Sequence, residues 1–168
     1  INYRILNEKT VEKIDQKSVR TEYGNFNLIL YKDLIFDETH LVLQKGKISK
    51  NSPTLVRVQQ SNFFHDLLNI NEFGARWSVS DSMKKINEAG KGIILLIDGE
   101  NKKQDEFNEI NASKKKRITA PNNDPRRIGI GSQILRDLGV QKIKLMGSEV
   151  RYPSLSGFDL EVTEYLKK

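Results

Sequence analysis

The chain contains no cysteine, two histidines and one tryptophan among its 168 residues. Without a thiol it forms no disulfide and offers no thiolate to a zinc ion, which is compatible with a reducing cytoplasm. No apolar run approaches the length that crosses a bilayer, and no signal-peptide pattern opens the sequence. We therefore expect a cytoplasmic protein without a membrane span.

Charged residues make up 30% of the chain and hydrophobic residues 37%, and the length suffices for one domain with a core. A net charge of +6 favours anionic partners, which include phosphorylated small molecules, nucleic acids and acidic proteins. The run Lys114–Arg117 is the densest basic cluster. It lacks the interleaved aromatic residues on which single-stranded nucleic acid stacks. Nucleic acid is therefore an unfavoured partner.

The first half of the chain has the pattern of an antiparallel, β-rich structure. Residues 1–17 are polar and rich in lysine and glutamate, so we interpret them as a partly helical linker and place the domain at 18–168. From residue 18 the pattern becomes strand-like around a Gly24-Asn25 turn. Two more short strands are expected at 40–44 and 54–59.

The second half alternates between helix and strand, which predicts an α/β core. Ser80 or Asp81 caps a helix that Gly90 ends. Residues 93–97 form a continuous apolar run typical of a strand buried on both faces. Further strands are predicted at 142–146 and 158–162, and the polar segment 99–123 is predicted to be a mobile loop.

A helix is well delimited between these last two regions. Asp124 is a natural N-cap, Pro125 suits the first helical position, and Gly139 ends the helix. Gly129 and Gly131 fit the interior poorly, because glycine there costs roughly 0.5–1 kcal/mol relative to alanine. Something is therefore expected to approach this backbone closely. Tight helix–sheet packing is one explanation, and a bound ligand is the other.

Five blocks of the sequence stand in one order along the chain: Val56-Arg57-Val58, AGKGIILL at 89–96, Asp124-Pro125-Arg126, GIGSQILRDLGV at 129–140 and GFDLEV at 157–162. Their order and spacing resemble those of GTP cyclohydrolase II, an enzyme of riboflavin biosynthesis. The resemblance covers roughly residues 18–166 and implies that family's α/β fold. It also implies a reaction in which zinc and magnesium assist opening of the guanine imidazole ring of GTP, with release of formate and pyrophosphate.

The family's zinc ligands, which are three cysteines, are missing from this chain. Gap-free placement from Arg57 to Gly90 puts Asn62, Phe73 and Ala75 at those positions. None of them supplies a thiolate, and a zinc ion that holds a reactive water needs at least about three protein ligands. The resemblance therefore implies a lost zinc site, and we predict no metal ligands and no cofactor.

The part of the family's site that remains is its phosphate end. By resemblance, Asp124 is the general acid/base and Arg126 contacts the α-phosphate, both now vestigial. Taken without the resemblance, an N-cap aspartate beside a surface arginine explains this pair equally well. The nucleotide-binding candidates that the resemblance adds are Arg57, Glu100, Lys102 and Arg151.

These observations predict a catalytically degenerate GTP cyclohydrolase II-like domain with a structural or regulatory role. In many bacteria this fold is the C-terminal half of a bifunctional protein. Its N-terminal half makes 3,4-dihydroxy-2-butanone 4-phosphate. Because the chain starts at Ile1, we expect such a synthase to be fused upstream, together with homodimerisation and residual binding of GTP or another phosphate.

Two other hypotheses are retained for the function of the chain. The first is an active cyclohydrolase that hydrolyses GTP by zinc-free chemistry. The second is a basic nucleic-acid-binding module, which rests on charge alone.

Overall fold

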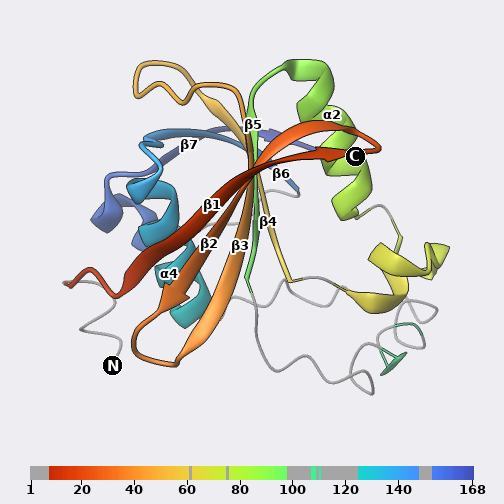
Figure 1. Ribbon diagram of the computed structural model, residues 1–168, viewed down its shortest axis with the longest axis horizontal. Helices are drawn as coiled ribbons and strands as arrows, with labels where there is room; N and C mark the ends of the chain where they lie inside the picture. Colours follow the sequence, from red (N-terminus) through yellow and green to blue (C-terminus); the bar gives the residue numbers. More distant parts are fainter. Residues whose placement is uncertain are drawn as a thin grey trace.

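One mixed β-sheet with helices on both faces forms the centre of the computed structural model (Figure 1). The structure describes residues 8–60, 62–74, 76–97, 107–108, 110, 125–147 and 153–168. In these ranges the elements are β1 (Val11–Thr21), β2 (Gly24–Asp33), β3 (Glu38–Lys45), β4 (Thr54–Gln59), η1 (Phe63–Leu67), η2 (Asn71–Phe73), α2 (Val79–Ala89), β5 (Gly92–Leu96), α4 (Pro125–Asp137), β6 (Lys142–Met146), η3 (Pro153–Phe158) and β7 (Glu161–Leu166).

The sheet has the strand order β1-β2-β3-β5-β4-β6-β7. Strands β1, β2, β3 and β5 pair antiparallel, whereas β4 pairs in parallel with β5 and β6, and β6 with β7. The predicted antiparallel first half is therefore correct for β1 to β3 and wrong for β4. Because β4 to β7 run in one direction, they all end at the same side of the sheet, which we call the carboxyl edge.

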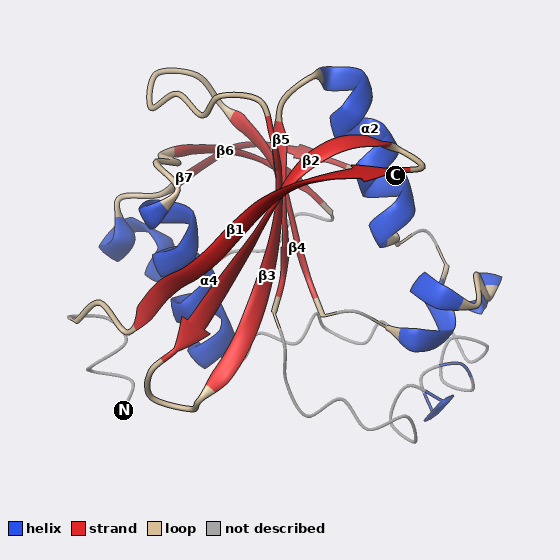
Figure 2. Ribbon diagram, in the orientation of Figure 1, coloured by secondary structure: helices blue, strands red, loops and turns tan. Residues whose placement is uncertain are grey.

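Alternating side chains of β5 divide the core into two layers. Ile93 and Leu95 pack in a cluster with Ile134 of α4, whereas Ile94 packs with Ile86 of α2. The three β5 residues are 0% exposed, which confirms the predicted strand buried on both faces. Helices α4 and α2 therefore cover opposite faces of the sheet, as Figure 2 shows.

Local capping chemistry explains where the two helices begin and end. The hydroxyl of Ser78 accepts a hydrogen bond from the Asp81 N–H at 3.1 Å, so α2 begins earlier than the predicted caps. Gly90 and Gly139, with φ of 78° and 88°, follow α2 and α4 as predicted.

The interior glycine at position 131 reflects close packing of α4 on the sheet. A Cβ at Gly131 would lie 3.3 Å from the Ile97 side chain and 3.5 Å from that of Leu95. The helix can therefore approach the sheet closely because this residue has no side chain. Helix–sheet packing, the first of the two explanations, accounts for Gly131.

Two predicted boundaries are wrong. The predicted linker includes residues 11–17, but these belong to β1, and Val11 is 2% exposed. Its polar composition arises because β1 is an edge strand, exposed on both sides between residues 12 and 18. The last strand was predicted at 158–162, but Phe158 is the final residue of η3 and β7 begins at Glu161. Between them Asp159 has a φ of 55°, which is not a strand conformation. Residues 1–7 and most of the predicted loop at 99–123 lie outside the described residues.

Among the helices in the described ranges, none has both the length and the apolar character that crossing a bilayer requires.

Gly92 provides a test of how closely α2 packs on the sheet. An added Cβ would lie 2.8 Å from Ile86 and 2.9 Å from the Leu55 carbonyl oxygen. We expect Gly92→Ala to lower the free energy of unfolding by about 1–3 kcal/mol, measured by urea denaturation. The control is Gly157→Ala, where an added Cβ meets nothing within 4 Å and the effect stays below about 1 kcal/mol. Equal denaturation midpoints for the two variants would contradict this packing.

Candidate functional site

The carboxyl edge, at which β4 to β7 end, is the side of the sheet where a ligand site is expected. Strand β4 lies between β5 and β6 and is parallel to both, so the direction of the chain connections reverses there. Open α/β sheets bind ligands at such a reversal, outside the carboxyl ends of the strands. In the sequence, Glu100 and Lys102 follow β5, Arg151 follows β6, and Asp124 directly precedes α4, to which Arg126 belongs.

Asp124, Glu100, Lys102 and Arg151 lie outside the described residues, and only the backbone of Arg126 is described, in the first turn of α4. Their roles remain predictions.

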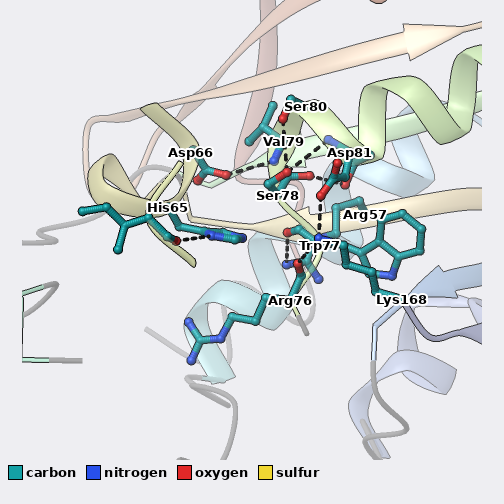
Figure 3. A network of polar contacts seen from close by, with 12 residues as sticks. Arg57, His65, Asp66, Arg76, Trp77, Ser78, Val79, Ser80, Asp81 and Lys168 are labelled. Carbon is teal, nitrogen blue, oxygen red and sulfur yellow. Dashed lines mark hydrogen bonds and ion pairs between the residues drawn. The ribbon is translucent and has the colours of Figure 1, made fainter. Parts of the chain in front are cut away.

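Arg57 of β4 is half-buried and joins three parts of the chain (Figure 3). Its Nε donates to Gln59 Oε1 at 2.8 Å, its Nη1 to the carbonyl of Met146 at 3.1 Å, and its Nη2 to the carbonyl of Trp77 at 3.0 Å. The guanidinium thus connects β4 to the end of β6 and to the segment before α2. Arg57 has a structural role in the described residues, in addition to the nucleotide contact that the resemblance implies.

A carboxylate at the centre of this region organises the backbone around it. Asp66 of η1 accepts hydrogen bonds from the Val79 N–H at 2.9 Å, the Asn62 N–H at 2.7 Å and Gln59 Nε2 at 3.1 Å. Hydrogen bonds to a charged acceptor are stronger than those between neutral groups. We call this set the Asp66 network, and it connects the end of β4, η1 and the start of α2.

Asn62 lies in the Asp66 network and at the first position that the resemblance assigns to a zinc ligand. Its side-chain oxygen accepts from the N–H groups of Phe64 at 3.1 Å and His65 at 3.0 Å, and the residue is 9% exposed. An amide oxygen has two acceptor sites, and both are used here. Asn62 is therefore a helix cap and does not fit a zinc ion. The Phe73 side chain and Ala75 lie outside the described part.

The C-terminal residues close the other side of the site. Lys168 Nζ lies 2.6 Å from Asp81 Oδ2 and donates to the Arg76 carbonyl at 3.3 Å. This ammonium group holds the pKa of Asp81 below its ordinary value, against a smaller opposing effect of burial. Trp77 donates from its indole N–H to the Leu166 carbonyl at 3.0 Å. Its ring packs against the hydrophobic cluster that contains Ile86 of α2.

One residue of the carboxyl edge was missed in the sequence analysis. Gln60 accepts a hydrogen bond from Arg127 Nη1 at 2.7 Å, which ties the end of β4 to the first turn of α4. Its side-chain nitrogen is buried and has no hydrogen-bond partner among the described residues. A buried amide N–H is costly unless it meets an acceptor.

These features define the chain as an α/β domain of mixed sheet, with a candidate ligand site at the carboxyl edge of its parallel strands. The sequence model of GTP cyclohydrolase II matches residues 12–167. The chain belongs to the GTP cyclohydrolase II family.

Similar proteins carry names from the same pathway. A 3,4-dihydroxy-2-butanone 4-phosphate synthase of Pseudomonas aeruginosa is 42% identical over 99% of this chain and 46% of its own length. The riboflavin biosynthesis protein RibBA of Cytophaga hutchinsonii is 32% identical over 98% of this chain and 43% of its own. The crystal structure of RibBX, a two-domain 3,4-dihydroxy-2-butanone 4-phosphate synthase from A. baumannii, superposes with a TM-score of 0.65 at 36% identity, covering 98% of this chain and 42% of that one.

The family resemblance found in the sequence is thus confirmed, together with its riboflavin-biosynthesis context. The chain spans less than half the length of the curated relatives it matches here.

Removal of the Asp66 carboxylate tests its organising role. We expect Asp66→Ala to lower the free energy of unfolding by about 1–3 kcal/mol, because it leaves backbone N–H groups without an acceptor. The matched control is Asp15→Ala on exposed β1, where, within the described part of the chain, the carboxylate accepts from the neighbouring Gln16 N–H. That change should stay within about 0.5 kcal/mol. A similar loss in both variants by chemical denaturation would argue against the network.

The pairing of Asp81 with Lys168 predicts a pH dependence of stability. Because the folded pKa of Asp81 is below its ordinary 3.8, its stabilisation is complete above that value and is lost as the pH falls through the folded pKa. Both side chains are about one-third exposed, so the contribution at neutral pH is below about 1 kcal/mol. In Lys168→Met, NMR titration should show the pKa of Asp81 rising toward 3.8. An unchanged titration would rule out the pairing in solution.

Proposed function

We propose that this chain is a catalytically degenerate GTP cyclohydrolase II domain that acts as a non-catalytic companion of a 3,4-dihydroxy-2-butanone 4-phosphate synthase domain. The observation that carries this proposal is the state of Asn62. At the first expected zinc position, this residue uses both acceptor sites of its side-chain oxygen to cap η1. The chain has no cysteine anywhere to replace it.

The chemistry of ring opening explains why this difference matters. Attack on the guanine imidazole ring needs an activated water, and a zinc ion supplies one by lowering the pKa of a bound water. Asp66 is the carboxylate nearest to Asn62 in sequence, and it accepts three hydrogen bonds that organise the local backbone. These hydrogen bonds do not suit it to activate a water in place of zinc. The residues of this region thus support a structural use of the site.

The names of the relatives support the second part of the proposal. Relatives that align with this chain over less than half of their length are named for the synthase, and the A. baumannii relative is described as having two domains. We infer that a synthase domain is covalently attached upstream and that this domain supports its assembly, with a homodimer as the expected unit.

Residual binding of GTP or another phosphate at the carboxyl edge forms the third part of the proposal. Helix N-termini attract phosphate through their unpaired N–H groups, and Arg126 belongs to the first turn of α4. Next to this turn, Gln60 has a buried side-chain nitrogen without a hydrogen-bond partner among the described residues. A phosphate or carbonyl oxygen would satisfy that donor.

Formate release measures the absence of turnover directly. Purified protein is incubated with GTP, zinc and magnesium, beside a cysteine-containing GTP cyclohydrolase II as positive control. We expect no formate above a protein-free blank from this chain and steady release from the control. Formate release that depends on bound zinc would overturn the proposal of degeneracy, and release without metal would favour zinc-free catalysis.

An arginine substitution tests residual phosphate binding. We expect Arg126→Ala to weaken GTP binding about tenfold to hundredfold, the effect of losing a charged hydrogen bond, measured by isothermal titration calorimetry. The control is Arg20→Ala on the exposed edge strand, which should bind GTP like the parent protein. Equal weakening by the two variants would indicate nonspecific charge attraction in place of a site.

A further inference from the structure

A second cluster of ionisable side chains lies in the β2–β3 hairpin. Asp33, Glu38 and His40 each offer one potential ligand atom, and these atoms all lie within 4.8 Å of one another. The hairpin register brings them together, because Asp33 pairs with Glu38 and Tyr31 pairs with His40. Alternate residues of paired strands share a face, so the three side chains belong to one side of the sheet.

The burial of this cluster is unusual for its charge. Asp33 and His40 are 0% exposed, and Glu38 is partly exposed. Asp33 Oδ1 accepts from the N–H groups of Ile35 at 2.9 Å and Phe36 at 3.4 Å and so caps the turn. Asp33 Oδ2 is buried and has no hydrogen-bond partner among the described residues. A buried carboxylate oxygen without a partner is costly, and a bound cation removes that cost.

We propose that Asp33, Glu38 and His40 form a binding site for a divalent transition-metal cation of the Zn²⁺ class. One imidazole nitrogen with carboxylate oxygens suits such an ion, whereas Mg²⁺ and Ca²⁺ prefer oxygen ligands alone. Ligand atoms about 2.0–2.2 Å from one tetrahedral ion are separated by about 3.3–3.6 Å. The three atoms, which lie within 4.8 Å of one another, would move closer to that separation when the ion binds.

The position of the cluster suggests what the cation would do. Leu41 pairs with Leu96, so the start of β3 lies beside the end of β5, and the β2–β3 turn belongs to the carboxyl-edge end of the sheet (Figure 1). Phe36 of the turn packs against the α4-side cluster. A cation bound to both strands of the hairpin would therefore fix this turn against the core. The site shares no residue with the Asp66 network.

The sequence alone predicts no metal site here, because no motif groups these three residues. His40 was one of only two histidines, and the spacing Asp33, Glu38, His40 matches no familiar metal motif. The site exists only once the hairpin register is known.

Zinc binding to the whole chain, stripped with chelator and returned to metal-free buffer, tests this inference. We expect one Zn²⁺ per chain by calorimetry, a visible Co²⁺ spectrum with nitrogen and oxygen ligation, and a higher melting temperature when Zn²⁺ is added. Asp33→Asn keeps an oxygen for the Ile35 and Phe36 N–H groups and removes the charge. Glu38→Gln alters a partly exposed residue and so is suited to keep the fold.

In both variants Zn²⁺ should bind at least tenfold more weakly. Mutating even a residue that only hydrogen-bonds to a metal ligand lowers metal affinity by roughly tenfold to hundredfold, and here a ligand itself is changed. The matched control is Asp37→Asn, an exposed turn residue that pairs with Lys32 at 2.9 Å and lies outside the cluster. His65→Ala tests the other histidine. The inference is overturned if no stoichiometric Zn²⁺ binds, if Glu38→Gln binds Zn²⁺ like the parent, or if His65→Ala removes the binding.

Discussion

The parallel placement of β4 between β5 and β6 is the constraint on which the rest of the structure depends. It places the ends of these strands at one edge and leads the chain into η1, α2 and α4 from that edge. Two side chains connect the segments that leave this edge. Arg57 donates to two backbone carbonyls, and Asp66 accepts from two backbone N–H groups. The edge that binds ligands in open α/β sheets is thus secured here by internal hydrogen bonds.

This arrangement explains how the segment after β4 is ordered in a chain that has no cysteine. In the segment after β4, Asn62 caps η1 and the carboxylate of η1 reaches the start of α2. This segment is ordered by hydrogen bonds to two acceptors, the Asn62 side chain and the charged Asp66 carboxylate. The fold of this segment therefore does not depend on a bound zinc ion, which the proposed function requires.

Local patterns predicted the elements whose signals are short in range. Strand β5 followed from an unbroken apolar run, and α4 followed from its proline and its terminal glycine. Residues 11–17 of β1 were not predicted as strand, because an edge strand exposed on both sides has no alternation to detect. The start of α2 was placed late because Ser78, Ser80 and Asp81 are all acceptable caps, and only the structure shows which oxygen accepts.

The site residues were predictable only where a family resemblance supplied them. Asp66 accepts hydrogen bonds from the N–H groups of both Asn62 and Val79. Val79 lies 13 residues beyond Asp66 in the sequence, and no spacing rule predicts a contact between them. The Asp33 cluster likewise depends on the register of a hairpin, which pairs Asp33 with Glu38. Both arrangements arise from tertiary structure, and single-sequence patterns do not encode it.

The most direct measurement of the central claim is a single-turnover experiment, in which GTP is mixed with an excess of the zinc- and magnesium-supplied protein and the nucleotide is analysed by chromatography over time. The account predicts that all GTP is recovered with its imidazole ring intact, even when most of it is bound. Appearance of a ring-opened diaminopyrimidine in proportion to the protein would contradict it.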